Sequence, residues 1–249
     1  MRGVRPATTF LVFLGLWWLV ARYSSVPPFM LPPPGDVAAA LWTQRGLLLG
    51  NTLVTLAEIL LGLLCGTVLG GIAALGIVFS PVLQRWLMPV LVVSQAIPVF
   101  ALAPLMVLWF GFGMAAKIIM AMLVIFFPVT ANFADGLRRT PPGWLDLART
   151  MNASPLAVLR HIRLPAGLPA FGSGLRVAAV IAPIGAIIGE WAGASSGLGY
   201  VMLNANARIQ TPLMFAALFI LAALTIALYV LVDRLLRRLL YWAPDTTGG

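Results

Sequence analysis

Charged residues are scarce in this chain, which restricts the class of protein it can be. Of its 249 residues only 9% are charged, with 16 lysines and arginines against 7 acidic residues. In a typical soluble domain, about a quarter of the residues are charged. The mean hydropathy is +1.00, so the chain is an integral membrane protein. Its excess of positive charge does not indicate nucleic-acid binding, because no soluble basic domain is present to carry that function.

Cysteine, histidine and lysine, which serve many catalytic and metal sites, each occur only once. Cys65 lies in an apolar run, where it can form no disulfide within the chain and no metal cluster. His161 has no acid or nucleophile near it in the sequence, which argues against a membrane-embedded enzyme. Lys117 does not follow a glycine-rich phosphate loop, so any energy from ATP must come from a partner. The chain is therefore predicted to be non-catalytic and to bind no cofactor or metal.

Long uncharged runs predict an all-α membrane protein, because about 20 apolar residues suffice to cross a bilayer. We expect a single transmembrane domain over residues 1–249, with six spans near residues 6–23, 56–80, 86–110, 115–134, 170–192 and 213–235. Between the third and fourth spans the chain is expected to turn at Gly111-Phe112-Gly113. Glycines at helical spacing, such as Gly62, Gly66 and Gly70, predict close helix packing, either within the chain or between subunits.

Three prolines, Pro89, Pro98 and Pro104, interrupt the third span. Broken helices at membrane depth are tolerated where they are buried in protein or line an aqueous cavity. This makes Gln95 and Pro98 candidates for a translocation path, although simple proline kinks are an equally valid interpretation. By contrast, the proline-rich segment 26–34 is predicted to cross the outer surface as extended chain.

Two carboxylates, Glu58 and Glu190, lie near the expected outer ends of the second and fifth spans. Acidic groups inside a membrane are functional candidates, so Glu190 joins the candidate path. The alternative is that both carboxylates lie at the wet membrane boundary, where they cost little.

The distribution of basic residues predicts the orientation, because they collect on the cytoplasmic side of membrane proteins. With both termini inside, the outer side holds only Arg22, Arg45, Lys117 and Arg208. All other arginines then lie inside, and the group Arg234, Arg237 and Arg238 is expected to contact anionic membrane lipid. We therefore predict a multi-pass protein with a cytoplasmic N-terminus and C-terminus.

A polar, arginine-rich segment over residues 135–169 separates the fourth and fifth spans and reads as two short helices with a sharp corner. Thr140 is the expected N-cap and Pro141 the first helical residue. Asn152 is expected in the left-handed conformation that ends this helix. Ser154 and Pro155 repeat the cap-then-proline signal, and the second helix is expected to end at Leu164-Pro165.

The first of these helices should present a small apolar face of Leu145, Ala148 and Met151 that has no obvious core to cover. Such a helix in the cytoplasm requires a groove on a partner protein. His161, in the second helix, is expected at the surface.

The run Asp146-Leu147-Ala148-Arg149-Thr150-Met151-Asn152-Ala153-Ser154, followed by Leu164-Pro165, resembles the EAA loop of binding-protein-dependent ABC transporter permeases. Asp146 stands at the glutamate position and Ala148 at the second alanine. Leu147 replaces the first alanine, and Asn152 replaces the usual glycine while keeping the corner feasible. The resemblance extends from about residue 50 to residue 240, and it is to the nitrate, sulfonate and taurine branch.

The resemblance implies the type I ABC importer permease fold and a specific set of partners. Two permease copies, as a homodimer, would form the pathway in the bacterial inner membrane. A cytoplasmic ATPase would hold ATP and Mg, and a periplasmic or lipid-anchored binding protein would deliver solute. The implied ATPase-coupling residues are Trp144, Leu145, Asp146, Ala148, Arg149, Met151, Asn152, Ala153, Ser154, Leu164 and Pro165.

The substrate is less well defined than the transport class. Residues 189–206 look most similar to the group that carries thiamine-precursor pyrimidines, so a heterocycle is favoured, with nitrate, sulfonates or taurine next. An autonomous secondary transporter is the alternative function. It would need coupling-ion carboxylates in mid-membrane and usually more spans or repeats.

Overall fold

The computed structural model describes residues 4–243, and this part of the chain contains helices but no strand. The prediction of an all-α protein is confirmed. The helices, in order, are α1 (Val4–Tyr23), α2 (Pro34–Thr43), α3 (Arg45–Phe79), α4 (Pro81–Ala96), α5 (Val99–Phe110), α6 (Met114–Arg138), α7 (Pro142–Thr150), α8 (Pro155–Val158), the π-helix η1 (Leu159–Arg163), α9 (Leu164–Trp191), α10 (Leu198–Ala207) and α11 (Thr211–Leu239).

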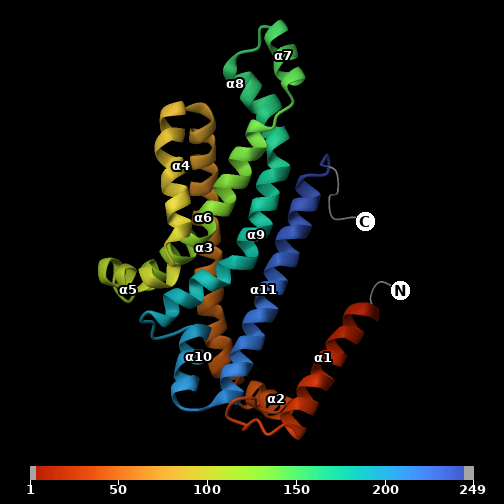
Figure 1. Cartoon of the computed structure of the whole chain (residues 1–249), viewed down its shortest axis with the longest axis vertical. Helices are drawn as coiled ribbons and strands as arrows, with labels where there is room; N and C mark the ends of the chain where they lie inside the picture. Colours follow the sequence, from red (N-terminus) through yellow and green to blue (C-terminus); the bar gives the residue numbers. More distant parts are fainter. Residues whose placement is uncertain (1–3, 244–249) are drawn as a thin grey trace.

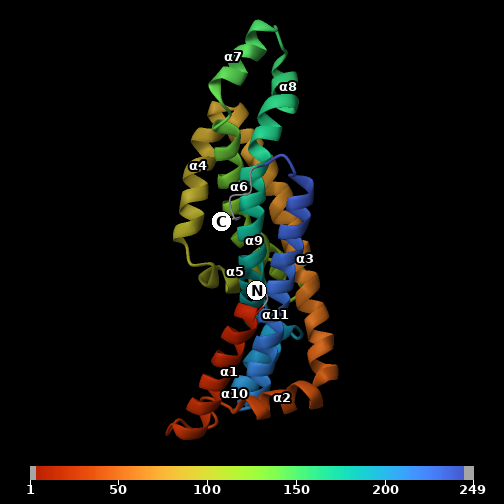
Figure 2. The same cartoon turned by 90° about the vertical axis from the view of Figure 1, so that its right-hand side faces the viewer.

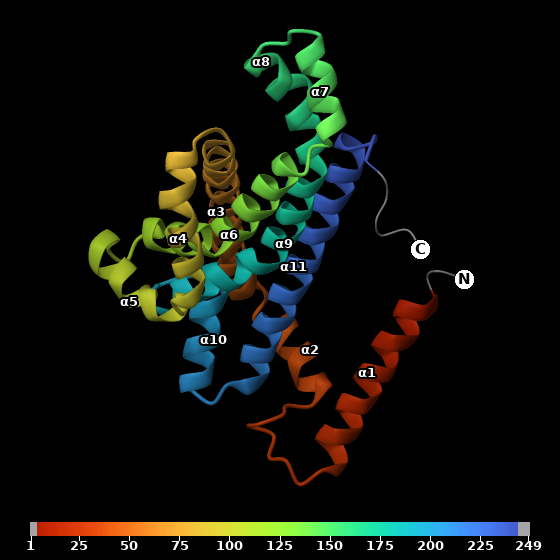
Figure 3. The same ribbon diagram turned by 45° about the horizontal axis from the view of Figure 1, so that its top comes forward.

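The molecule is elongated, with α7 and α8 at one end and α2 and α10 at the other (Figure 1). Helix α1 runs toward the α2 end, whereas α11 runs back and finishes on the side of α7 (Figures 1 and 2). The N-terminal end of α1 and the C-terminal end of α11 thus point toward the same end of the molecule. Helices α4 and α5 project to one side of the α3–α6–α9 bundle (Figure 3).

Glycines bring α6 into direct contact with α3 on one side and α9 on the other. A Cβ on Gly62 of α3 would lie 2.5 Å from the Cβ of Ala121, and one on Gly66 would lie 2.9 Å from Ile125. On α9, a Cβ on Gly185 would lie 2.6 Å from the Cα of Ala121. Small residues at helical spacing permit this backbone approach. The glycine faces are therefore internal packing surfaces.

When helices are judged by length and hydropathy alone, fewer than six of them qualify as membrane spans. Over the described residues, four helices are long and apolar enough to cross a membrane, or five if the bent pair α4–α5 is one span. Helix α1 contributes only a shorter apolar segment, Val12–Tyr23, so a sixth crossing stays a prediction. The fourth, fifth and sixth predicted spans correspond to α6, α9 and α11.

The third predicted span is broken, as its prolines indicated, but only one proline makes the break. Helices α4 and α5 meet at an angle of 105°. Pro98 lies at the junction as the N-cap of α5, while Pro89 and Pro104 stay inside helices. Gly111, with φ of 75°, ends α5 and confirms the predicted turn before α6.

The proline-rich segment 26–34 is not extended throughout, which corrects that prediction. The amides of Met30 and Leu31 both donate to the carbonyl oxygen of Pro27, closing a turn. Pro34 then begins α2, where its missing N–H costs nothing. Helices α2 and α10 were not predicted, because both are too short to register as spans.

Replacing Gly185 with alanine should destabilise the protein by about 1–3 kcal/mol, because the new methyl group would meet backbone atoms of Ala121 that cannot move alone. Gly50 is the matched control, since it is also helical but a Cβ added there would have no atom within 4 Å. Its alanine variant should be neutral or slightly stabilising. Free energies of unfolding in detergent would check both. Equal effects at the two positions would contradict the packing account.

Candidate functional site

The segment between α6 and α9 forms a hairpin of α7, α8 and η1 that projects beyond the helix bundle (Figure 1). Asn152 turns the chain with φ of 52°, confirming its predicted left-handed conformation. The amide of Ala153 closes the end of α7 by donating to the carbonyl oxygen of Ala148 at 2.9 Å. The Ser154 hydroxyl accepts from the amide of Ala157, as the cap signal predicted. The hairpin corner is therefore locally fixed.

Two boundaries of the hairpin differ from the prediction. Thr140 is not the N-cap of α7, because Pro141 takes that position and the Thr140 hydroxyl instead donates to the Leu137 carbonyl at 2.9 Å. The second helix does not end at Leu164-Pro165 but continues through η1 into α9. A π turn widens the helix by one residue and so makes room for the proline ring, which would otherwise clash with a carbonyl in the preceding turn.

An apolar groove of about 450 Å³ lies along the inner side of the hairpin. It is lined by Trp144, Leu147, Ala148, Met151, Ala153, Ala157, Val158, His161, Ile162 and Pro165. Ala148 is buried, whereas the side chains of Leu147 and Met151 are 61% and 73% exposed. The predicted face is thus corrected: Leu147 belongs to the exposed apolar set, and Leu145 is half-buried.

The charged residues of α7 face water. Arg149 donates to the Asp146 carboxylate at 2.9 Å, and both side chains are largely exposed. His161 is also exposed, as predicted, with Nδ1 3.1 Å from the Ala157 carbonyl oxygen. An exposed ion pair of this kind contributes little to stability. The hairpin therefore combines a wet charged surface with an uncovered apolar groove.

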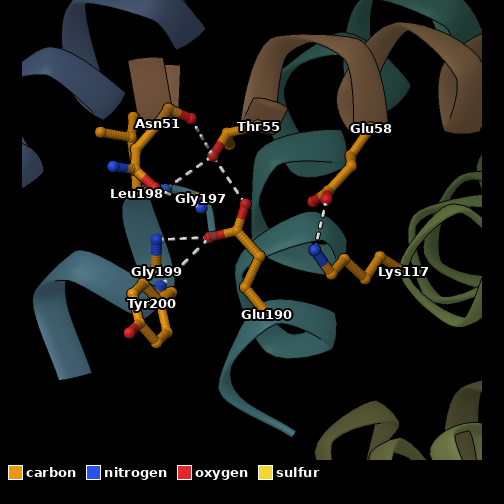
Figure 4. A network of polar contacts seen from close by, with 9 residues as sticks. All are labelled: Asn51, Thr55, Glu58, Lys117, Glu190, Gly197, Leu198, Gly199 and Tyr200. Carbon is orange, nitrogen blue, oxygen red and sulfur yellow. Dashed lines mark hydrogen bonds and ion pairs between the residues drawn. The ribbon is translucent and has the colours of Figure 1, made fainter. Parts of the chain in front are cut away.

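At the other end of the bundle, Glu190 near the end of α9 organises a buried polar network (Figure 4). Its Oε1 accepts from the Thr55 hydroxyl at 2.6 Å, and its Oε2 accepts from the amides of Gly199 and Tyr200. Those amides belong to the first turn of α10, where a carboxylate satisfies free N–H groups and the helix dipole. Glu190 is only 1% exposed and acts as a cap for α10.

The same network fixes the loop before α10 to α3. The Gly197 amide donates to Asn51 Oδ1 at 2.7 Å, and the Leu198 amide donates to Thr55 Oγ1 at 2.8 Å. Gly197 has φ of 113°, and a Cβ there would overlap the Glu190 carboxylate. Only glycine meets both conditions. This arrangement gives Glu190 a structural task, and its proposed place in a translocation path stays a prediction.

A buried ion pair lies beside this network. Lys117 Nζ of α6 is 2.7 Å from Glu58 Oε1 of α3, and the two residues are 5% and 0% exposed (Figure 4). Both glutamates are buried in protein, so the alternative that they lie at a wet boundary is wrong. The prediction that Lys117 lies toward the outer side of the membrane stays a prediction. Glu58 Oε2 has no hydrogen-bond partner among the described residues, so Lys117 is its main compensation.

The other candidate path residues are exposed, unlike the buried residues of this network. Gln95 and Pro98 are exposed in the single chain, at the break between α4 and α5. No hydrogen bond among the described residues joins them to Glu190. The described part of the chain also contains no group of three or more histidine, cysteine, aspartate or glutamate residues able to hold a metal.

Asn51, Thr55 and Lys117 are site residues that the sequence analysis missed. Asn51, Thr55 and Glu58 share one face of α3 at helical spacing, which is the only local signal. Their partners lie far along the chain: 135 residues separate Thr55 from Glu190, and 59 separate Glu58 from Lys117. Spacing alone could not have paired them.

Comparison with known proteins places this architecture in a family. A family model described as the binding-protein-dependent transport system inner membrane component matches residues 66–241. The chain belongs to that family. The solved MetNI methionine ABC transporter in an inward-facing conformation has a chain of the same fold, with a TM-score of 0.69 at 21% identity, over 79% of this permease and 97% of that chain.

Curated relatives match this permease almost end to end. A probable ABC transporter permease protein of Haemophilus influenzae is 54% identical, over 97% of this chain and 98% of its own. The formylaminopyrimidine transport permease protein ThiX of Halalkalibacterium halodurans is 36% identical, over 97% and 96%. The riboflavin transport system permease protein RibX of Chloroflexus aurantiacus is also 36% identical, over 94% and 88%. The predicted fold and ABC permease family are confirmed.

Replacing Lys117 with methionine should destabilise the permease by about 3–5 kcal/mol, because it leaves the Glu58 carboxylate buried and unpaired. Combining it with Glu58→Gln should restore much of the loss, since the uncompensated charge is then removed. A double-mutant cycle on unfolding in detergent would measure the coupling.

The exposed pair Asp146–Arg149 provides the control cycle, and it should show little coupling. Additive effects of the Lys117 and Glu58 substitutions would contradict an ion pair that matters to the fold.

Proposed function

We propose that this permease is the pathway-forming subunit of an ATP-driven importer, and that its hairpin docks into a cytoplasmic ATPase. The observation that carries the proposal is the uncovered apolar groove with exposed Leu147 and Met151, at the end of the molecule that projects beyond the bundle. Burying apolar side chains of this size is favourable by about 1.5–3 kcal/mol each. A partner cleft would supply that burial, and the exposed Asp146–Arg149 pair would remain at its rim.

The rest of the assembly follows from the same proposal. Two copies of the permease would form the pathway in the bacterial inner membrane, with both termini and the hairpin in the cytoplasm. A binding protein outside would deliver solute at the α2 and α10 end. The arginines of the hairpin and of the end of α11 support this orientation, because positive charge collects on the cytoplasmic side.

Within the family, we propose a nitrogen heterocycle as substrate, with a formylaminopyrimidine first and a flavin second. The names of the ThiX and RibX relatives support this class. The charges of the bundle support it as well, because Lys117 and Arg176, which lie among apolar residues within α6 and α9, are already paired. Lys117 is bonded to Glu58, and Arg176 donates to Asp233 at 2.7 Å. An anion such as nitrate or a sulfonate would find no free cation there.

The hydrogen bonds of Glu58 and Glu190 also argue against the alternative of an autonomous secondary transporter. Such a protein needs carboxylates that release and take up a coupling ion during transport. Glu58 is held by Lys117, and Glu190 by Thr55 and the α10 amides. Uptake driven by an ion gradient without ATP would contradict the proposed class.

Replacing Leu147 with aspartate should reduce ATP-driven uptake in reconstituted vesicles at least tenfold, because a charge would enter the proposed ATPase interface. The conservative Leu147→Met should keep most of the uptake, since methionine preserves the apolar volume. Leu147 is exposed, so neither change should affect membrane insertion. Full uptake by the aspartate variant would exclude this surface as the docking site.

The substrate proposal is tested by uptake into vesicles that contain the whole transporter and its neighbouring binding protein. Labelled formylaminopyrimidine should accumulate with ATP, riboflavin more weakly, and taurine and nitrate not above background. Accumulation of taurine or nitrate in preference to the heterocycles would contradict the substrate class while leaving the ABC permease assignment intact.

A further inference from the structure

A second cavity, which adjoins the hairpin groove and shares Trp144 and Pro165 with it, lies where the hairpin joins the bundle. Its volume is about 510 Å³, and its lining includes Arg139, Trp144, Pro165, Ala166, Ala170 and Trp242. The lining comes from the end of α6, the start of α7, the start of α9 and the residues that follow α11. Most of it is apolar, apart from one guanidinium and two indole rings.

In the orientation proposed above, on which this inference rests, the cavity would lie at the cytoplasmic membrane boundary. The apolar run of α11 gives way to the charged residues Asp233 and Arg234 in its last turns, and Trp242 follows shortly afterwards. Helix α6 likewise changes from apolar residues to Asp135 and Arg138 just before Arg139. Tryptophan is enriched at this level of membrane proteins, where its ring meets lipid headgroups. In the proposed orientation the cavity would therefore open at headgroup depth.

Arg139 brings a positive charge to the cavity without a compensating carboxylate. It is exposed, and no ion pair joins it to an acidic residue in residues 4–243. Asp233, an acidic group near the end of α11, is already held by Arg176 at 2.7 Å and Arg237 at 2.8 Å. The cavity thus offers a free cation beside an apolar surface.

We propose that this cavity binds an anionic phospholipid of the cytoplasmic leaflet. Its phosphate would be held by Arg139, and its glycerol and upper acyl region would pack on Trp242 and the small residues of α9. Basic pockets between membrane helices on the cytoplasmic side are suited to anionic headgroups. A bound lipid would hold the base of the hairpin against the end of α11, where Trp242 Nε1 already donates to the Pro165 carbonyl at 3.4 Å.

The test uses the full chain in phosphatidylcholine vesicles and follows tryptophan fluorescence as lipids with brominated acyl chains are added. Brominated phosphatidylglycerol should quench more strongly than brominated phosphatidylcholine at the same mole fraction, and Trp242→Phe should remove most of that excess. Arg139→Gln should weaken the preference for the anionic lipid about fivefold, which is the contribution of one basic residue near an anionic surface.

Arg138→Gln is the matched control, because it removes the same charge one residue earlier and its side chain lines a different cavity, beside Ile77 and Asp135. It should leave the preference nearly unchanged. Arg139→Lys should retain most of it, which separates lost binding from lost folding. Equal losses in Arg138→Gln and Arg139→Gln would overturn the proposal in favour of diffuse surface attraction.

Two further outcomes would also overturn it. Competition by soluble glycerol phosphate as effective as that by phosphatidylglycerol would identify a free-anion site instead of a lipid site. If brominated phosphatidylglycerol no longer quenched more strongly than brominated phosphatidylcholine in the assembled transporter, the ATPase would cover the cavity. We expect the stronger quenching by phosphatidylglycerol to persist in the whole transporter and to be unaffected by glycerol phosphate.

Discussion

The contact of α6 with both α3 and α9 is the constraint on which the rest of the structure depends. Gly62 and Gly66 on one side and Gly185 on the other bring helix backbones within reach of Ala121 and its neighbours. In a membrane, helices gain little from hydrophobic association, so such packing must supply much of their cohesion. Helices α4, α5, α10 and α11 are arranged around this three-helix unit (Figure 3).

Close packing also determines how charged residues are held at the end of the bundle next to α10. A Cβ on Gly189 would lie 2.9 Å from the Cα of Lys117, so the start of α6 is packed tightly against α9, and the Lys117 side chain is buried in the bundle. Glu58 compensates it from α3. Glu190, the residue after Gly189 on α9, does not pair with the lysine but caps the start of α10. The two carboxylates are thus parts of one assembly that joins four helices.

How far the sequence predicted the structure depended on how local each signal was. The hairpin corner was predictable, because Asn152, Ser154 and Pro155 act on backbone within a few residues of themselves. The end of the second hairpin helix was not, because a π turn accommodates Pro165, which ordinarily marks a helix stop. The Glu58 and Glu190 partners were missed for a third reason: they depend on which helix faces which, and that is decided by packing over the whole bundle.

A continuous helical run connects the hairpin to the Glu190 network. Residues Pro155–Trp191 form one helical run of 37 residues, with the hairpin at one end and Glu190 at the other. A helix of that length spans about 55 Å, more than the hydrocarbon core of a bilayer. A displacement of α8 would be passed along α9 to the α10 cap only as far as this run is rigid. Its helical hydrogen bonding is irregular at the π turn η1 and at Pro169 and Pro183 inside α9, so these are the places where such a displacement would be absorbed.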